Sequence, residues 1–379
     1  MSGPYFLLCP KVRRSGIPVL SLPLPALLRQ RLVPAVIMTA LLLPGGRPYA
    51  QSLAAQGGSE LPDPAVTING PALALRDMSR LAEAEPALRQ ALLADEQSYG
   101  PGHPAVAVRL SNLAFLLQNT GRRSEAEQLY RRALMIFETS TGPYHPGVAT
   151  ALNNLAGLLQ ASGRMDEAEL MYLRALEATQ KVSGPDDPTV AVRLSNLGFL
   201  LQSANRLREA EPVYRRALAI TENSYGPDHS AVASRLNNLA AVLQSANRLR
   251  DAEALFRRAL AITEKNDGPD DPAVAAGLAN LARLLRAGGD LGEAEPMFRR
   301  ALAINERNGG PDHPDVAASL NDLAVLLHDA NRRSEAIPLL RRALEITEKN
   351  YGADHPATRT VRRNLRLLEA RAGAADYGR

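Results

Sequence analysis

The chain has 379 residues, of which 45% are hydrophobic and 4% aromatic, and its formal net charge is +4. The charge is uneven, because the first 50 residues hold six basic and no acidic side chains while the rest of the chain is nearly neutral. Beyond residue 50 the chain lacks the basic excess of a nucleic-acid-binding protein, and we expect no nucleic-acid partner. The only cysteine, Cys9, lies in the same first segment, which excludes disulfides and thiolate metal sites from the remainder.

Residues 1–55 have the features of a signal peptide-like leader. An apolar run at residues 32–43 follows Arg29 and Arg31, and small residues come after it. This run is shorter than the roughly 20 residues of a membrane-spanning helix. We therefore expect an exported protein, periplasmic or secreted, that touches a membrane only if the leader stays uncleaved. Two alternatives remain open, namely a membrane anchor formed by residues 32–43 and a cytoplasmic protein with a misplaced start codon.

A repeated unit follows the leader. Residues 56–78 mix Gly, Pro and Ser without a sustained period, which is typical of a flexible linker. A unit of 42 residues then recurs over residues 79–371, and residues 372–379 form a short tail. Such a period is typical of a solenoid, in which each unit buries its apolar face only against its neighbours. One glycine per unit marks the period, at Gly100, Gly142, Gly184, Gly226, Gly268, Gly310 and Gly352.

Each unit contains two amphipathic stretches, which predict two helices. In the second full unit the apolar residues of the first stretch recur at i, i+3, i+4 and i+7 over Leu152–Leu159. A similar stripe covers Ala168–Leu176 in the second stretch. We expect each second helix to begin at an N-cap Ser or Asp with Glu three residues later, as in Ser124–Glu127 and Asp166–Glu169.

The array is predicted to contain a half unit, six full helix pairs and a closing helix. The half unit matches a second helix without its partner, and the closing helix runs from Pro356 to about Arg371. In the closing helix Arg362, Arg366 and Glu369 take the places of core residues, and charge on the outer face keeps the end of a solenoid soluble. The six pairs begin at Pro104, Pro146, Pro188, Ser230, Pro272 and Pro314.

These units resemble tetratricopeptide repeats. The 42-residue spacing and the motifs HPxVAxxLNNLAxLL and EAExLYRRALxIxE look like the kinesin light chain subtype. The resemblance implies an all-α fold, a right-handed α-α superhelical solenoid whose first helices line the concave face. A signal-like leader stands where kinesin light chains carry a coiled coil, which argues against a motor subunit. The family positions matched in the first full unit are Leu110, Leu113, Ala114, Leu117, Gly121, Ala126, Tyr130, Ala133 and Leu134.

Five histidines share one place, just before the first helix of a unit. Asp187 and Asp271 take this place in two other units and Pro usually follows, so we expect helix N-caps. A ladder of metal ligands is the competing interpretation, but neighbouring units lie about 10 Å apart, too far to share zinc bonds of about 2 Å. We expect no metal, no cofactor and no small-molecule substrate. The five are His103, His145, His229, His313 and His355.

Two polar rows run along the first helices, and the resemblance implies that they face the concave groove. An amide offers both a donor and an acceptor, which suits the backbone of a bound peptide. Phe115 and Phe199 are expected to add apolar anchors, and the lining becomes charged toward the C-terminal end. Alternatively, the asparagines tie neighbouring first helices together. The candidate groove residues are Asn112, Phe115, Asn154, Gln160, Asn196, Phe199, Gln202, Asn238, Gln244, Asn280, Arg283, Arg286, Asp322 and His328.

A uniform array of this kind predicts an extended binding surface and not a reactive pocket. The Ser, His and Asp residues form no constellation apart from the repeats, and the repeated carboxylates are assigned to helix starts and solvated faces. We therefore expect a non-enzymatic scaffold that binds a peptide of a partner protein in its concave groove. The alternative is a regulatory or oligomerisation accessory subunit of an enzyme complex.

Overall fold

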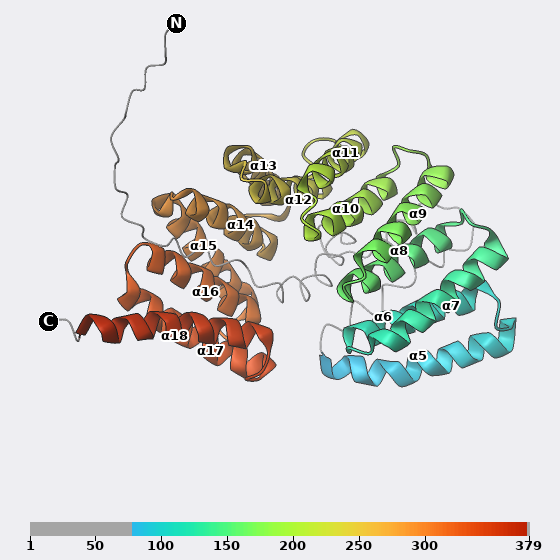
Figure 1. The fold of residues 1–379 in the computed structure, drawn as a ribbon, viewed down its shortest axis with the longest axis horizontal. Helices are drawn as coiled ribbons and strands as arrows, with labels where there is room; N and C mark the ends of the chain where they lie inside the picture. Colours follow the sequence, from blue (N-terminus) through green and yellow to red (C-terminus); the bar gives the residue numbers. More distant parts are fainter. Residues whose placement is uncertain (1–77, 377–379) are drawn as a thin grey trace, which may run out of the picture.

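The computed structural model describes residues 78–376, with side chains for residues 84–370. The described part contains fourteen helices and no strand. Figure 1 shows them stacked into an arch, with α5 (Met78–Tyr99) at one end and α18 (Pro356–Asp376) at the other. The predicted all-α solenoid is thereby confirmed. The predicted leader at residues 1–55 and all but the last residue of the predicted linker lie outside the described residues.

Six helix pairs lie between these ends, and all begin at the predicted residues. The closing helix is longer than predicted, since α18 includes residues 372–376, which were assigned to the tail. Those residues are rich in alanine, the strongest helix former. The pairs are α6 (Pro104–Asn119) with α7 (Arg123–Thr141), α8 (Pro146–Ala161) with α9 (Met165–Ser183), α10 (Pro188–Ser203) with α11 (Leu207–Tyr225), α12 (Ser230–Ser245) with α13 (Leu249–Asp267), α14 (Pro272–Gly288) with α15 (Leu291–Gly309), and α16 (Pro314–Asp329) with α17 (Arg333–Tyr351).

A core of leucine and alanine runs through the array, with one large ring in each of the first five full units and Leu340 in the sixth. Leu110, Leu113 and Leu117 of α6 are fully buried, and so are Ala126 and Ala133 of α7. The small alanine side chains let the two helices approach closely, and burial of this apolar surface is the main stabilising contribution. The ring that fills the remaining space is at most 3% exposed in each of five second helices, at Tyr130, Tyr172, Tyr214, Phe256 and Phe298.

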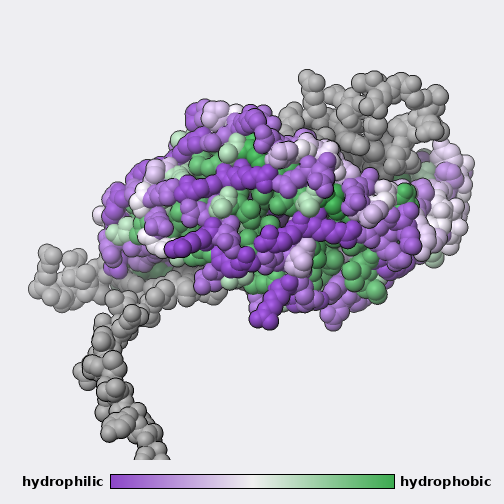
Figure 2. Space-filling model, turned by 90° about the horizontal axis from the view of Figure 1, so that it is seen from above, coloured by the Kyte–Doolittle hydropathy of each residue, from purple (hydrophilic) through white to green (hydrophobic). Residues whose placement is uncertain are grey.

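The first helices line the inner side of the arch. Figure 1 shows this most clearly for α10 and α12, which lie inside α11 and α13. First helices of successive units also contact one another, as α6 contacts α8 and α14 contacts α16. From above, in Figure 2, hydrophilic side chains form ridges with hydrophobic residues showing between them. No helix among the described residues is long and apolar enough to cross a membrane.

The repeated histidines cap the first helices, as predicted. The Nδ1 atom of His145 accepts a hydrogen bond of 3.0 Å from the backbone N–H of Gly147. A carboxylate oxygen of Asp187 plays the same part for the N–H of Thr189, at 2.8 Å. A neutral imidazole and a carboxylate thus serve the same purpose at this position. An aromatic ring four residues earlier stacks on the cap in three units, in the pairs Tyr99–His103, Tyr225–His229 and Tyr351–His355.

The second helices do not begin as predicted. Their N-cap residues include Arg122 and Arg164, neither of which makes a side-chain capping bond, and Ser124 and Asp166 already lie inside the helix. The predicted capping box is therefore wrong. The first turn of each second helix is stabilised instead by the acidic side chains near its positive end.

The tight turn between the paired helices explains this difference. After α6 the N–H of Arg122 bonds to the carbonyl of Leu117 at 2.8 Å, and the N–H of Gly121 bonds to Gln118 at 3.2 Å. This is a Schellman turn, which needs a left-handed residue, and Gly121 has φ of 88°. The chain enters the second helix directly after it. Three units use asparagine with φ of 60° at this place, at Asn205, Asn247 and Asn331.

The N-cap arginines join neighbouring units. Arg164 pairs with Glu167 of its own helix at 2.5 Å and with Glu127 of the preceding second helix at 2.8 Å. The sequence assigned the repeated glutamates only to helix starts and solvated faces. The structure shows that they also form ion pairs between units. Each ion pair is at least partly exposed and individually weak, but the arrangement recurs. Four other N-cap arginines pair with acidic residues at the equivalent positions of their own and the preceding second helix, and they are Arg122, Arg206, Arg248 and Arg332.

Candidate peptide-binding surface

The first polar row provides one side chain per unit on the inner surface, by which we mean the side of the first helices that faces the inside of the arch. Asn112, Asn154 and Asn238 are partly buried members of this row. The amides of Asn154 and Asn238 make no hydrogen bond with other described residues. The Oδ1 atom of Asn112 is buried and has no partner there either. These three amides keep hydrogen-bonding capacity for a ligand.

Other members of the row tie the array together. The Nδ2 atom of Asn196 donates to Oδ1 of Asn153 in the preceding first helix at 2.7 Å. Asn280 accepts a bond of 2.9 Å from Nη1 of Arg283. Asn196 therefore joins neighbouring first helices, which is the alternative considered from the sequence, whereas the bond of Asn280 stays within α14.

The glutamines of the second polar row, Gln160, Gln202 and Gln244, are buried or partly buried, and two of them make hydrogen bonds. Gln160 is 5% exposed, and its Oε1 accepts a hydrogen bond of 3.2 Å from the hydroxyl of Tyr172. Its Nε2 lies 3.5 Å from the hydroxyl of Ser203 in the next unit. Gln202 repeats this contact with Ser245, also at 3.5 Å. Gln244 is partly buried and has no such contact among the described residues.

Phe115 and Phe199 occupy the same position two units apart. Both rings are partly buried, and Phe115 packs against the hydrophobic core. The position between them in α8 holds Gly157, and the one after them in α12 holds Ala241. The inner surface therefore alternates a large ring with a small residue over these four units.

The C-terminal part of the row is charged, but its charges neutralise one another. Arg283 pairs with Asp322 of the next first helix at 2.7 Å. Arg286 pairs with Asp329 at 2.8 Å. His328 is partly buried on the same helix as the two acids. The predicted change from amides to charged residues is present, and the ion pairs between these residues join α14 to α16.

Two arginines, Arg235, which is buried, and Arg193, which is partly buried, were missed by reasoning from sequence. Arg235 is 6% exposed, and burial lowers its pKa to about 10. Burial likewise lowers the pKa of Arg193 to about 10, and its Nη2 lies 3.3 Å from the hydroxyl of Thr150. The Nε atoms of both arginines are buried without a partner among the described residues. Both share the repeat position of Arg109, which is the signal that could have revealed them.

No group of three potential metal ligands occurs among the described residues. The capping histidines lie one per unit and are each occupied with a backbone N–H. The geometry therefore offers hydrogen bonding and apolar contact along an extended surface, which is the chemistry of peptide recognition.

Comparison with known proteins agrees with this architecture. A family model described as tetratricopeptide repeat matches six overlapping segments, at residues 65–139, 110–181, 147–223, 194–265, 231–307 and 273–349. The comparison with curated proteins finds no match.

Several solved structures are similar. The crystal structure of BtubC (BKLC) from P. vanneervenii is 28% identical, with a TM-score of 0.51, over 62% of this chain and 92% of that one. A Podosopora anserina protein with nearly identical TPR-like repeats, described with the kinesin light chains, is 24% identical, with a TM-score of 0.48, over 55% and 98%. The apo form of RapI is 18% identical, with a TM-score of 0.54, over 71% and 92%, which is a likeness of fold alone. The chain therefore belongs to the tetratricopeptide repeat family and is of the kinesin light chain-like type.

Proposed function

We propose that this protein is a non-enzymatic scaffold that holds a peptide segment of a partner protein along its inner surface. The repeat family supports the general role of protein interaction. The observation that carries the specific proposal is the set of unbonded amides at Asn112, Asn154 and Asn238. A partly buried amide without a partner loses hydrogen bonds to water, and a peptide backbone would restore them.

The spacing of the units suggests the conformation of the peptide. Successive first helices lie about 10 Å apart. A polyproline II segment has three residues per turn and advances about 9.3 Å per turn. Each turn would therefore present the same backbone groups to the next unit, so Asn112 and Asn154 would contact residues three apart. The rings of Phe115 and Phe199 would pack against apolar side chains of the same segment.

A photo-crosslinking amino acid at position 154 or 238 tests this proposal in the source organism. We expect both positions to capture the same short segment of one partner, identified by mass spectrometry. Exposed amides on other faces, Gln90 and Gln128, provide matched control positions. Capture at the control positions alone would place the partner on the outer surface. Capture of one enzyme in fixed stoichiometry through a folded face would favour the accessory-subunit alternative.

Affinity for the captured segment gives a second test. Replacing Asn154 and Asn238 together by alanine should weaken binding by about 2 kcal/mol, at about 1 kcal/mol for each hydrogen-bonding amide. The Gln90→Ala/Gln128→Ala variant should bind like the unmodified protein. Since both asparagines lie outside the leucine core, helicity by circular dichroism should be unchanged. A folded double variant with full affinity would disprove the inner-surface assignment.

A further inference from the structure

The face of α18 that has no neighbour differs in chemistry from every other first helix. Among the described helices, α18 occupies the place of a first helix but is followed by no second helix. It packs against α17 and α16, so the side that receives a second helix in the full units is open to solvent. In α16 this side is formed by Leu320, Ala324 and Leu327, which are at most 1% exposed. In α18 the equivalent residues are Arg362, Arg366 and Glu369.

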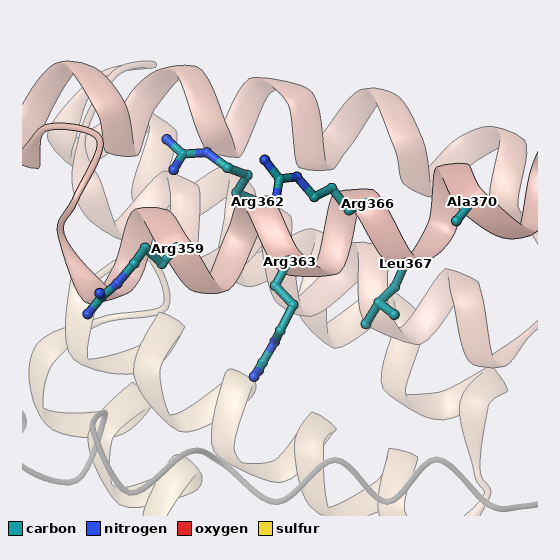
Figure 3. A pocket seen from close by; sticks show the side chains of 6 residues that line it. All are labelled: Arg359, Arg362, Arg363, Arg366, Leu367 and Ala370. Atoms are coloured by element: carbon teal, nitrogen blue, oxygen red, sulfur yellow. The ribbon is translucent and has the colours of Figure 1, made fainter.

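A shallow hollow of about 510 Å³ lies along this face. Figure 3 shows four arginine side chains and a leucine projecting from successive turns of α18 around it. At 100° per residue, Arg359, Arg363 and Arg366 lie on one strip of the helix, and Leu367 borders it. Leu367 is 41% exposed, which places an apolar side chain beside the three guanidinium groups. The lining residues are Arg359, Arg362, Arg363, Arg366, Leu367 and Ala370.

Three of these arginines have no counter-charge. Arg362 is bound to Glu348 at 2.6 Å, but the side chains of Arg359, Arg363 and Arg366 make no ion pair or hydrogen bond with other described residues. Glu369 of the same helix is already paired with Arg341 at 2.8 Å. The hollow therefore holds three positive charges without a described counter-charge over a helix length of about 10 Å.

Capping the solenoid does not require this arrangement. A polar surface of either sign, or of mixed sign, keeps the end of an array soluble. Like charges at i and i+4, as at Arg359 and Arg363, destabilise a helix, whereas Glu and Arg at that spacing stabilise it. The second helices of this chain use the stabilising pattern, for example in Glu211 and Arg215. A single sign of charge beside an exposed leucine points to a ligand of opposite charge.

We propose that Arg359, Arg363, Arg366 and Leu367, the α18 arginine surface, dock an acidic segment of a partner protein. Each guanidinium would donate charge-assisted hydrogen bonds to a carboxylate, and Leu367 would contact an apolar side chain of the segment. The arginines at i, i+4 and i+7 match carboxylates placed at i, i+4 and i+7 of a helical partner segment. Leu367 shares the repeat position of Phe115 and Phe199, so this surface borders the C-terminal end of the inner surface, but it contains none of the unbonded amides and does not depend on their function.

The charge of the rest of the array favours a protein partner over nucleic acid. Binding to nucleic acid relies on a basic surface that follows many phosphates. Here two arginines of the adjoining helix α17 are already paired, Arg342 with Glu306 and Arg341 with Glu369. The positive surface is therefore short, and an acidic peptide of two or three turns covers it.

Fluorescence anisotropy with the full chain tests the proposal. The probe is a labelled synthetic helical peptide with Glu at i, i+4 and i+7 and Leu at i+8, and the matched control peptide has Gln in place of each Glu. We expect the acidic peptide to bind and the Gln peptide to bind at least about tenfold more weakly, with a loss of affinity as salt rises. Equal binding of both peptides, or no binding of the acidic one, would overturn the proposal.

Paired charge reversals localise the binding. Arg363→Glu with Arg366→Glu should raise the Kd for the acidic peptide at least about tenfold. Arg208→Glu with Arg250→Glu changes the net charge equally at exposed arginines that lack ion pairs among the described residues, and should change the Kd less than about twofold. Arg363→Gln with Arg366→Gln should have an intermediate effect. Equal effects of the two reversals would mean non-specific attraction, and tighter arginine-dependent binding of a single-stranded oligonucleotide would assign the surface to nucleic acid.

Discussion

Arg109 of α6 and Asp95 of α5 form an ion pair of 2.7 Å that joins the half unit to the first full unit. The equivalent positions three units later hold Arg235 and Thr221, so the arginine is present and the acid is missing. Burial lowers the pKa of Arg235 to about 10, which shows that its charged form is disfavoured where it lies. A buried charge without a partner destabilises a protein. This position is therefore a weak point of the array.

Replacing Thr221 by aspartate should supply the missing partner. Thr221 takes the place of Asp95, which pairs with Arg109, so we expect a carboxylate there to reach Arg235, and its burial at 2% exposed strengthens the attraction. We expect the free energy of unfolding to rise by about 1 kcal/mol, measured by urea denaturation followed by circular dichroism.

The control is Thr263→Asp, at the same repeat position one unit later. There the position equivalent to Arg235 holds Gly277, so the new carboxylate is buried without a partner. This variant should lose about 1 to 3 kcal/mol of stability. Similar losses in both variants would show that the carboxylate introduced by Thr221→Asp does not reach Arg235, and the ion-pair interpretation of this position would be wrong.

The fold could be predicted because local signals agree with the period. Proline at the first helical position and glycine or asparagine in the turn recur at fixed intervals, so all six pairs begin where expected, for example at Pro146 and Pro272. The start of the second helices was mispredicted because the Schellman turn after Gly121 shortens the loop. Serine is a common N-cap residue, but Ser124 lies two residues after the actual N-cap, Arg122.

The candidate surface was only partly predictable, because its hydrogen bonds join residues about one unit apart. Asn196 is engaged because the residue 43 positions earlier is Asn153, which offers an acceptor. Asn154 and Asn238 make no such bond, and the residues 43 positions before them are Ser111 and Ser195, whose hydroxyls donate to their own helix. Helical periodicity shows the row, but it does not show which amides are engaged, because the partner lies in another unit for Asn196 and in the same helix for Asn280.

His145→Ala and His145→Asp test the capping role of the histidines. Alanine removes the acceptor for the N–H of Gly147 and should cost about 1 kcal/mol, whereas aspartate keeps an acceptor and should preserve the stability. The ring of Phe137 stacks on His145, with centroids 6.3 Å apart, and both variants remove this contact equally, so their difference reports the cap. Thermal unfolding measures the stability of both variants. Stoichiometric metal in protein purified without added metal, lost in both variants, would contradict capping as the main role.

We also propose that the protein is exported after cleavage of its leader. The apolar run at residues 32–43, preceded by arginines, supports this. N-terminal sequencing of the protein isolated from its source should find a mature chain that begins between Gln51 and Gln56. A protein with an intact Met1 in the soluble cytoplasm would disprove export, and an intact leader in the membrane fraction would indicate an anchor.

The buried tyrosines make the stability of the array sensitive to alkaline pH. Burial raises the pKa of Tyr130 and Tyr214 well above the usual value. Because the folded pKa lies above the unfolded one, this contribution is complete below the unfolded pKa of about 10 and is lost as pH rises beyond it. Each such tyrosine should lower the unfolding free energy by about 1.4 kcal/mol per pH unit in that range.

Tyr214→Phe isolates this effect. Phe256 and Phe298 already fill the equivalent place, and the Tyr214 hydroxyl makes no hydrogen bond with other described residues, so the variant should be as stable as the unmodified protein at pH 7. Between pH 10 and 11 it should gain about 1 kcal/mol relative to the unmodified protein, because the unfolded tyrosine is only half ionised at pH 10. Urea denaturation at several pH values measures the difference. Tyr144→Phe, at a residue that is 45% exposed, is the control and should leave the pH dependence unchanged. If both variants follow the same curve as the unmodified protein, burial of Tyr214 does not control its ionisation.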